Sequence, residues 1–305
     1  MNRPRTWQTL LAYATIYLVW GSTFLAIRIG VKEVPPFLLA AIRFLLAGGA
    51  MLAWMLARGA KAPTAREWRS AFLVALPLFL VNYGLVFWAE TRIPSGVTAV
   101  MQATIPAFMV LAEVALLGTQ RLSWLLGAAL VLGLAGVAVL TGNSLGLGGS
   151  AVDRVSAGAL LVASSSWALG SVLTRKVPLP ASRPMSSGAQ MLAGGVWLTL
   201  GAVALGETHG FDPRAVSVGA WLALLYLVVA GSIAAFTAYT WLMQNDSPTR
   251  VGTYAYVNPV VAVLLGYFAA NEPIGLRTVA GTACVLLSVL MITTMRRAAE
   301  KARAT

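Results

Sequence analysis

The stretch WRSAFLVALPLFLVNYGLVFW, from Trp68 to Trp88, returns later in the chain as WLALLYLVVAGSIAAFTAYTW, from Trp221 to Trp241. A shift of 153 positions superposes the two stretches, and the same shift places Pro106 on Pro259. Both are apolar and, at about 1.5 Å per helical residue, long enough to cross the roughly 30 Å of hydrocarbon in a bilayer. The sequence therefore predicts a membrane protein built by duplication.

The repeat extends upstream, where a shift of 147 positions places Trp20 on Trp167 and Arg28 on Arg175. We divide the chain into a first five-helix repeat, residues 1–144, and a second, residues 145–305. Because each half holds an odd number of membrane-crossing segments, the second half must lie upside down relative to the first. Inverted repeats of this kind are the architecture of many secondary transporters.

The composition agrees with a membrane fold, because 58% of the residues are hydrophobic, 10% are charged and the mean hydropathy is +0.78. A soluble domain of 305 residues would need more polar surface. Long runs that are free of charge, one of them interrupted only by Arg43, predict an all-α integral membrane protein with ten transmembrane helices. The runs cover residues 6–27, 36–57, 70–89, 93–112, 122–152, 155–174, 184–206, 215–245, 251–271 and 278–295.

Lys and Arg are retained on the cytoplasmic side of short loops. Most of the 22 in this chain fall on one side of the ten expected helices, which places both termini in the cytoplasm. The formal net charge of +12 is then explained by this asymmetry and by contact with anionic lipid. The expected partner of this positive charge is the lipid bilayer and not a nucleic acid.

Pro106 and Pro259 occupy matching positions in the fourth and ninth expected spans. Proline removes a backbone hydrogen bond, so both residues are expected to break or bend their helices. Gln102 and Asn258 flank them with amides that could bond an opened backbone or a passing solute. Two interpretations stay open: a pair of broken helices at a substrate site, or stable kinks that shape the bundle.

Aromatic and polar residues recur at helical spacing inside the spans, where each group is a candidate wall of a cavity. Rings can stack on a solute or pack in the bundle, and mid-span amides can bind a solute or bond a neighbouring helix. The predicted substrate-binding residues are Tyr17, Trp20, Asn82, Tyr83, Gln102, Trp167, Ser171, Phe236, Tyr239, Tyr254 and Asn258.

Two ionisable residues inside spans are candidates for coupling or gating. Glu113 could hold a proton or a cation, although its position near Arg121 also suits a structural ion pair. Arg43 could pair with Glu33 or Glu90, which the topology places on the same side, as a gate or as plain stabilisation.

Small residues recur every four positions in the last span of each half, at Ala129 and Gly133 and at Ala280, Cys284 and Ser288. Such seams let helices approach closely. We expect the seam to lie within one chain, which favours a monomer and leaves a dimer open.

Catalysis finds little support in the residues. The single histidine, His209, lies in an expected external loop with Glu207 and Asp212, which leaves at most an incidental metal site and no intramembrane Ser-His pair. No Gly-rich phosphate loop precedes a Lys-Ser or Lys-Thr pair. We therefore expect no enzyme activity, no cofactor and no structural metal.

Trp20-Gly21-Ser22-Thr23-Phe24, the two proline segments and Asn271-Glu272-Pro273-Ile274 together resemble the EamA family of the drug/metabolite transporter (DMT) superfamily, over nearly the whole chain. The chain is similar above all to bacterial ten-span, YddG-like exporters of aromatic amino acids and other amphipathic metabolites. One departure is Gly118-Thr119-Gln120, where such proteins commonly carry a Gly-Glu pair.

The resemblance implies the bacterial inner membrane and a basket-like inverted-repeat fold. Its central cavity would be lined by the first, third, fourth, sixth, eighth and ninth spans, with the fifth and tenth outside it. We expect a secondary transporter, not driven by ATP, that exports small amphipathic metabolites, foremost amino acids including aromatic ones, by alternating access. The alternatives are a multidrug or organic-cation exporter and, behind it, an intramembrane enzyme or a channel.

Overall fold

The computed structural model describes residues 6–117, 124–141, 153–245, 251 and 254–304, and within these ranges every regular element is helical. The first half contains α1 (Thr6–Ala14), η1 (Thr15–Val19), α2 (Trp20–Gly30), α3 (Pro36–Ala57), α4 (Ala65–Ala75), η2 (Leu76–Tyr83), α5 (Gly84–Glu90), α6 (Ser95–Gln102), α7 (Ile105–Leu117) and α8 (Trp124–Thr141). The second half contains α9 (Arg154–Leu173), α10 (Arg183–Ala204), η3 (Pro213–Ala215), α11 (Val218–Tyr226), η4 (Leu227–Ala234), α12 (Ala235–Asn245), α14 (Tyr254–Ala270) and α15 (Leu276–Ala304).

Six continuous helical stretches in the described chain are long and apolar enough to cross a membrane: Thr6–Gly30, Pro36–Ala57, Ala65–Glu90, Ser95–Leu116, Arg154–Leu173 and Val218–Tyr239. Shorter apolar helices follow at Trp124–Leu140, Val257–Ala270 and Leu276–Ile292. The protein is therefore an all-helical, multi-pass membrane fold. The count of ten spans and the opposite orientation of the two halves stay predictions, as does the boundary at residues 144/145, which lies outside the described residues.

Local sequence explains where several helices begin. Thr64 and Glu67 form a reciprocal capping box at the start of α4, and the Asp153 carboxylate accepts backbone N–H groups at the start of α9. Pro36 stands in the first turn of α3, where the missing N–H costs nothing. Ser217 accepts from the Ala220 N–H and so begins α11.

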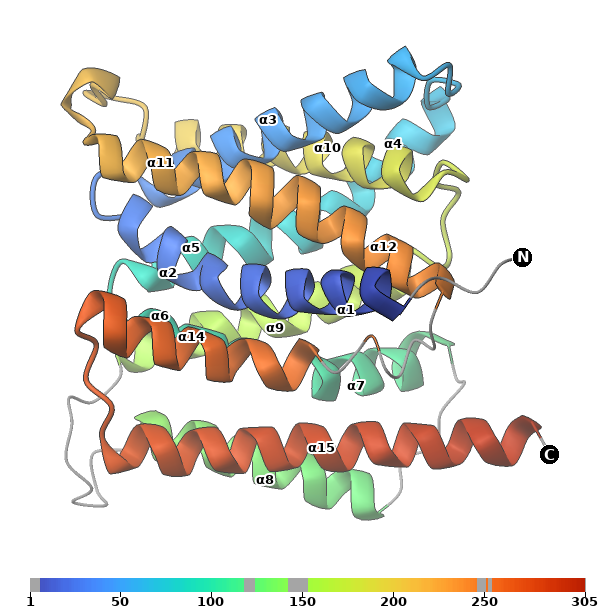
Figure 1. The fold of residues 1–305 in the computed structure, drawn as a ribbon, viewed down its shortest axis with the longest axis vertical. Coiled ribbons are helices and arrows are strands. Elements are labelled where there is room, and N and C mark those ends of the chain that lie inside the picture. The colour runs from blue at the N-terminus through green and yellow to red at the C-terminus, as the bar shows by residue number, and fades with distance from the viewer. Residues whose placement is uncertain (1–5, 118–123, 142–152, 246–250, 252–253, 305) are drawn as a thin grey trace.

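The helices of the two halves pack against each other in matching pairs (Figure 1). At one edge of the bundle α3 lies along α10, and at the opposite edge α8 lies along α15. Between these edges α9 packs on η2 and α7, while α2 packs on α11 and α14. This reciprocity is what two related halves would produce. It leaves the helices at 154–173, 65–90 and 95–117, and their counterparts in the other half, in the middle of the molecule.

Glycines bring the edge pairs into close contact. A Cβ on Gly48 would lie 2.5 Å from the Leu192 nitrogen of α10, so α3 and α10 meet backbone to backbone. On the other edge, a Cβ on Gly133 would lie 2.8 Å from the Ser288 hydroxyl, which donates to the Ala129 carbonyl at 2.6 Å. The expected small-residue seam is thus confirmed as a contact within one chain.

Both tryptophan-bounded stretches contain a wide, π-helical segment at matching positions, η2 in the first half and η4 in the second. Such segments are rare and open the backbone locally. The α6–α7 helix is interrupted in a different way, by turn residues Ala103 and Thr104. Irregular backbone in the described chain is therefore found in helices of the middle of the bundle, whereas the edge helices α3, α8, α10 and α15 are continuous.

Figure 1 also shows that α1 begins and α15 ends at the same end of the bundle. We call this the terminal end, and we call the opposite end, which carries residues 31–35, 91–94, 205–217 and 271–275, the far end. According to the Lys and Arg distribution the terminal end is predicted to be cytoplasmic.

Candidate functional site

One group of rings in the middle of the molecule joins α2 of the first half to α12 and α14 of the second. The Trp20 ring lies 5.3 Å from that of Tyr239 and 5.0 Å from that of Tyr254, between centroids. Phe236 extends the group, with its ring 6.0 Å from Tyr239. The Trp20 indole N–H donates to the Gly231 carbonyl of η4 at 3.1 Å, so the indole is oriented by the opened helix.

A second group of rings is centred on Tyr83, the last residue of η2. Its ring lies 5.7 Å from Trp167 of α9, in an edge-on contact, and 4.5 Å from Phe44 of α3. Phe79 stacks on it at 5.7 Å. Edge-on and offset contacts at these distances are the favourable arrangements for aromatic pairs.

Arg43 of α3 connects the two groups, because its guanidinium lies 5.5 Å from the Tyr83 ring centroid and its Nε donates to Ser232, the neighbour of the Gly231 that accepts from Trp20. We call Trp20, Tyr83, Trp167, Tyr239 and Tyr254 the aromatic cluster. It draws on five helical stretches from both halves, and its side chains are half-buried. Five of the predicted binding residues are thus brought together around one point between the halves.

The predicted mid-span amides lie beside the cluster but bond the protein itself. Asn82 is buried and donates to the Ala163 carbonyl of α9 at 2.9 Å. Gln102 accepts from the Ser164 hydroxyl of α9 at 2.6 Å. For these two residues the structure shows the helix-to-helix bonds that were one of the two interpretations.

The Asn258 side chain bonds backbone carbonyls of its own helix and of η1. With its NH2 group turned toward acceptors, the amide donates to the Tyr254 and Tyr17 carbonyls at 3.2 Å each. Tyr17 itself lies in η1, with its ring 5.6 Å from Tyr13, and packs in the same apolar group as Trp20, Tyr239 and Tyr254.

The two prolines differ in their surroundings. Pro106 stands in the first turn of α7, directly after the interruption at residues 103–104. Pro259 lies inside α14, which continues through it, so the expectation of a break there needs correction. The physical reason is that a proline removes only one N–H, so the other hydrogen bonds of the helix can continue past it.

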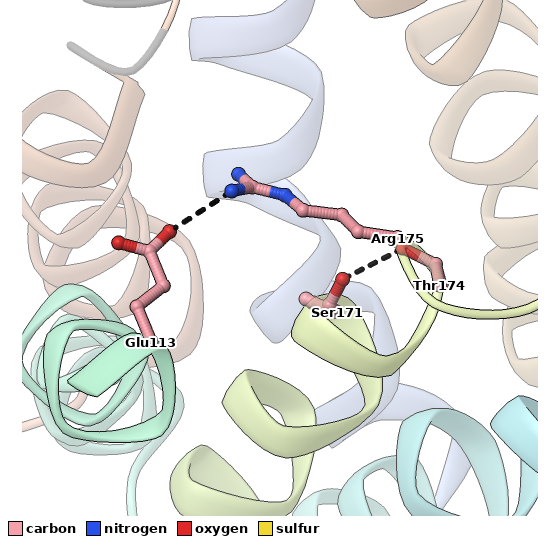
Figure 2. Close-up of polar contacts among 4 residues, drawn as sticks. All are labelled: Glu113, Ser171, Thr174 and Arg175. Carbon is pink, nitrogen blue, oxygen red and sulfur yellow. Dashed lines mark hydrogen bonds and ion pairs between the residues drawn. The ribbon is translucent and has the colours of Figure 1, made fainter. Parts of the chain in front are cut away.

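Toward the terminal end, Glu113 of α7 pairs with Arg175, which follows α9. Figure 2 shows the two side chains reaching across the gap between their helices, and Arg175 Nη1 lies 3.3 Å from Glu113 Oε1. The Glu113 side chain is 5% exposed and that of Arg175 is 59% exposed. The expected alternative partner, Arg121, lies outside the described residues. Ser171, one turn earlier on α9, lies half-buried, and its carbonyl accepts from the Thr174 hydroxyl at 2.6 Å.

Arg43 forms no ion pair with Glu33 or Glu90 in the described chain, which corrects that expectation. Its Nε donates to the Ser232 hydroxyl of η4 at 3.0 Å, and its guanidinium lies 5.5 Å from the Tyr83 ring centroid. The reason is that the opened η4 backbone offers Ser232 to α3, while Glu33 is held elsewhere. Arg43 therefore lies beside the aromatic cluster on its far-end side.

Three carboxylates at the far end each cap a helix of the opposite half, a role that the sequence did not indicate. Glu33 accepts from the Ser217 N–H at 2.6 Å and from its hydroxyl at 2.7 Å. Glu207 accepts from the Leu38 N–H at 2.9 Å. Glu272 accepts from the Ser95 and Gly96 N–H groups at 2.8 and 3.2 Å.

These caps satisfy N–H groups that have no partner within their own helices and place negative charge at positive helix ends. The hydrogen bonds from Ser217 hold the pKa of Glu33 below its ordinary value. Burial raises the pKa of Glu207, against the opposing effect of the Leu38 and Phe37 N–H groups. We call Glu33, Glu207 and Glu272 the far-end caps.

A hollow of about 330 Å³ opens at the far end between Glu33, Glu207, His209 and Asp212. It lies among connecting loops and away from the aromatic cluster. In the described part of the chain no three His, Cys, Asp or Glu side chains are placed to hold a metal ion. The hollow therefore does not form the metal site that His209 suggested.

The short motif that begins at Trp20 is explained by packing. A Cβ on Gly21 would lie 2.7 Å from Val261, so α2 and α14 touch there, and the Ser22 hydroxyl lies 2.6 Å from that of Tyr226. The signal for the Glu272 cap was present in Asn271-Glu272-Pro273-Ile274, where Asn271 takes a positive φ of 53°. Its partner on α6 could not be read from that motif.

Comparison with known proteins now adds to this geometry. The family model described as "EamA-like transporter family" matches residues 7–142 and 155–294. The "Uncharacterized inner membrane transporter YedA" of Escherichia coli (strain K12) is 38% identical over 284 residues, which cover 92% of this chain and 89% of that protein.

More distant relatives match over a similar share of the chain. An "Uncharacterized transporter" of Archaeoglobus fulgidus is 28% identical, over 94% of this chain and 97% of that protein. "Protein PecM" of Dickeya dadantii is 27% identical, over 90% and 88%. A solved structure titled only "Crystal structure of protein" matches with a TM-score of 0.62 at 24% identity, over 97% of this chain and all of that one, and supports the fold alone.

Proposed function

Because this chain belongs to the EamA-like transporter family, we propose that it is a secondary transporter that exports small amphipathic metabolites from the cytoplasm. Amino acids, including aromatic ones, are the proposed substrates, and alternating access of the two halves is the proposed mechanism. The family and the membrane fold support a transporter. The direction, the substrate class and the mechanism are our proposals.

The observation that carries the proposal is the aromatic cluster, in which rings of both halves meet with few charges beside them. Faces of Trp and Tyr bind rings by stacking, and the hydroxyls of Tyr83, Tyr239 and Tyr254 supply uncharged hydrogen-bonding groups. A solute that is partly apolar and partly polar suits such a wall. Because the rings come from both halves, a rocking motion would change the site on both sides at once.

An organic-cation exporter remains the alternative substrate class, since aromatic faces also attract cations. A dedicated cation site would place a free carboxylate next to the rings. Here Glu113 is paired with Arg175, and the charge packed on Tyr83 is the guanidinium of Arg43. This arrangement favours neutral or zwitterionic solutes over cations.

The experiment is uptake of radiolabelled Phe, Trp, Thr and Met into proteoliposomes that hold the purified protein. We expect saturable uptake and counterflow, which a channel does not show. Absence of uptake of every amino acid above empty liposomes, together with uptake of organic cations, would reject the substrate class proposed here.

A variant pair tests the site itself. Trp20→Leu should raise the KM for aromatic substrates by up to about tenfold, which corresponds to a ring contact of about 1.5 kcal/mol. Trp54→Leu is the matched control, because Trp54 is 45% exposed on α3 and packs on Arg58 at the surface. Equal KM values for the two variants would place the substrate elsewhere.

A further inference from the structure

The side chain of Glu90, at the end of α5, is completely buried, and neither carboxylate oxygen has a hydrogen-bond partner. An ionised carboxylate taken out of water without a donor is very unfavourable, and the neutral acid avoids most of this cost. Ionisable groups held this way inside a membrane protein mark functional sites by default. Glu90 has no role in the aromatic cluster or in the far-end caps.

The charged groups that act on Glu90 come from α2, from α3 and from the connection between α14 and α15, and each is engaged elsewhere. Arg28 of α2 donates to the backbone carbonyl of Glu90 and not to its carboxylate. Arg43 of α3 donates to Ser232, and Glu272 accepts from the start of α6. Both oxygens of the Glu90 carboxyl group are thus left without a hydrogen bond, while Arg28, Arg43 and Glu272 bond other groups.

The remaining elements packed on α5 bring no further charge to Glu90. From η2 comes Tyr83, which acts on Arg43, and from α6 comes the Ser95 hydroxyl, buried and also without a partner. At the start of α9, the Asp153 carboxylate accepts hydrogen bonds from Ser156 and Val155 and lies within electrostatic reach of Arg92. Protonation of Glu90 therefore changes the net charge of the group that it forms with Arg28, Arg43 and Glu272.

Arg43 can take two partners, and the protonation of Glu90 would choose between them. Its Nη1 is buried and has no hydrogen-bond partner, and α3, which carries Arg43, packs on α5, which carries Glu90. In the structure the guanidinium is held by Ser232, which suits a neutral Glu90. When Glu90 is ionised, the guanidinium gains a carboxylate partner and the bond to Ser232 competes with it.

This switch reaches the aromatic cluster on both sides. The guanidinium lies over Tyr83, whose ring contacts Trp167. Ser232 follows Gly231, whose carbonyl accepts from the Trp20 indole, and a Cβ on Gly231 would lie 3.3 Å from Arg43 Nη2. A movement of Arg43 toward Glu90 therefore changes contacts in both halves next to the proposed substrate site.

We propose that Glu90 is the proton-binding site that couples transport to a proton gradient, with Arg43 as the residue that reports its protonation to the aromatic cluster. Glu90 takes one proton from the solution at the far end, which frees Arg43 for Ser232. It releases that proton toward the other side when Arg43 pairs with the carboxylate. This inference rests on the proposed function, since it assigns the energy source of the same transporter.

The first experiment compares proteoliposome uptake with and without a pH gradient. Wild type should be stimulated by the gradient, and Glu90→Gln should lose the stimulation while it retains counterflow. Glu67→Gln, in an exposed capping box, is the control that should keep the stimulation. If Glu113→Gln loses the stimulation and Glu90→Gln keeps it, coupling belongs to Glu113 and the inference is overturned.

The second experiment needs no substrate. Infrared spectra of the full-length protein near pH 7 should contain the C=O stretch of a neutral carboxylic acid that Glu90→Gln removes and Glu67→Gln leaves. If Glu90→Gln does not fold, Glu90→Asp should shift the band. Absence of any Glu90-dependent acid band between about pH 5 and pH 8 would overturn the inference.

The two proposals fail separately. Counterflow of amino acids without gradient stimulation and without the acid band leaves the proposed function standing and removes Glu90 as the coupling site. Absence of all amino acid transport with the acid band present removes the proposed substrate class and leaves Glu90 as a proton-binding carboxyl.

Discussion

Residues of the same chemical type divide into two roles in the middle of this protein. The rings of the aromatic cluster meet one another between the halves, whereas Asn82 and Gln102 bond α9 directly. An amide group that is already hydrogen-bonded to the neighbouring helix, as donor in Asn82 and as acceptor in Gln102, positions that helix. The rings are therefore the proposed substrate contacts, and the two amides position α9.

Asn82→Leu tests this division. The change removes a buried interhelical hydrogen bond, so we expect a loss of about 1 kcal/mol in stability and an unchanged KM. Thermal unfolding in detergent and transport kinetics measure the two effects. Gln190→Leu is the control, because the Gln190 amide bonds Ser186 within its own helix. A large rise in KM for Asn82→Leu would return this residue to the substrate site.

At the scale of elements, close helix contacts depend on single glycines. Gly48 and Gly49 are neighbours on α3, but only Gly48 faces α10. A Cβ there would meet Leu192 N at 2.5 Å and the Gly188 carbonyl at 2.9 Å, while a Cβ on Gly49 would meet nothing within 4 Å. The two positions therefore form a matched pair.

Gly48→Ala should destabilise the protein by about 1 to 3 kcal/mol, because backbone atoms of α10 cannot move aside as side chains do. Gly49→Ala should be neutral or stabilise α3 by up to about 1 kcal/mol, since alanine is the better helix former. Thermal unfolding of both variants checks this. A similar stability for the two would mean that α3 and α10 are not in close contact in the membrane.

The far-end caps give the element contacts a dependence on pH. The pKa of Glu33 is lowered in the folded protein by the bonds from Ser217, so its contribution to stability is present above its unfolded pKa. That contribution is lost as the pH falls through the folded pKa. Glu33→Gln should therefore be less stable than wild type at pH 7, with the difference shrinking below about pH 4.

Glu207 provides the opposite case, because burial raises its pKa. Protonated Glu207 therefore stabilises the folded state at low pH, and this stabilisation is lost as the pH rises through the folded pKa. We measure melting temperatures of wild type and of both variants across pH. The difference between wild type and Glu33→Gln should thus change with pH in the opposite direction to the difference between wild type and Glu207→Gln. Equal slopes for both variants would show that the caps are not formed in solution.

At the scale of the whole molecule, the far-end caps all join one half to the other. Glu33 reaches from the first half to α11, while Glu207 and Glu272 reach from the second half to α3 and α6. If the two halves rock around the aromatic cluster, these contacts must open. The conformation in the structure is then the one with the far end closed.

A cross-link at the far end tests this motion. With Cys284 replaced by alanine, Glu33→Cys and Ser217→Cys joined by a short, reducible thiol cross-linker should abolish net transport, and reduction should restore it. Each single cysteine treated with the same reagent is the control. Undiminished transport by the cross-linked protein would contradict alternating access at this end.

Much of the site could be predicted because helical spacing places rings and amides on definite faces. The sequence indicated Trp20, Tyr83, Trp167, Tyr239 and Tyr254, which the structure brings together. It could not separate a ring that lines a site from an amide such as Asn82 that bonds a helix, since both suit a buried face. It also could not tell that Pro259 leaves α14 continuous, because a proline that removes one N–H can either end a helix or be carried inside it.

The sequence by itself determined that this chain is a helical membrane protein, because apolar runs of membrane length have no other stable place for their side chains and backbone. It also determined that the chain resembles itself across two halves. Only the tertiary structure decided which charged side chains are paired. Glu113 and Arg175 meet while Arg43 and Glu90 do not, since pairing depends on distances of a few ångströms between helices that are far apart in the chain.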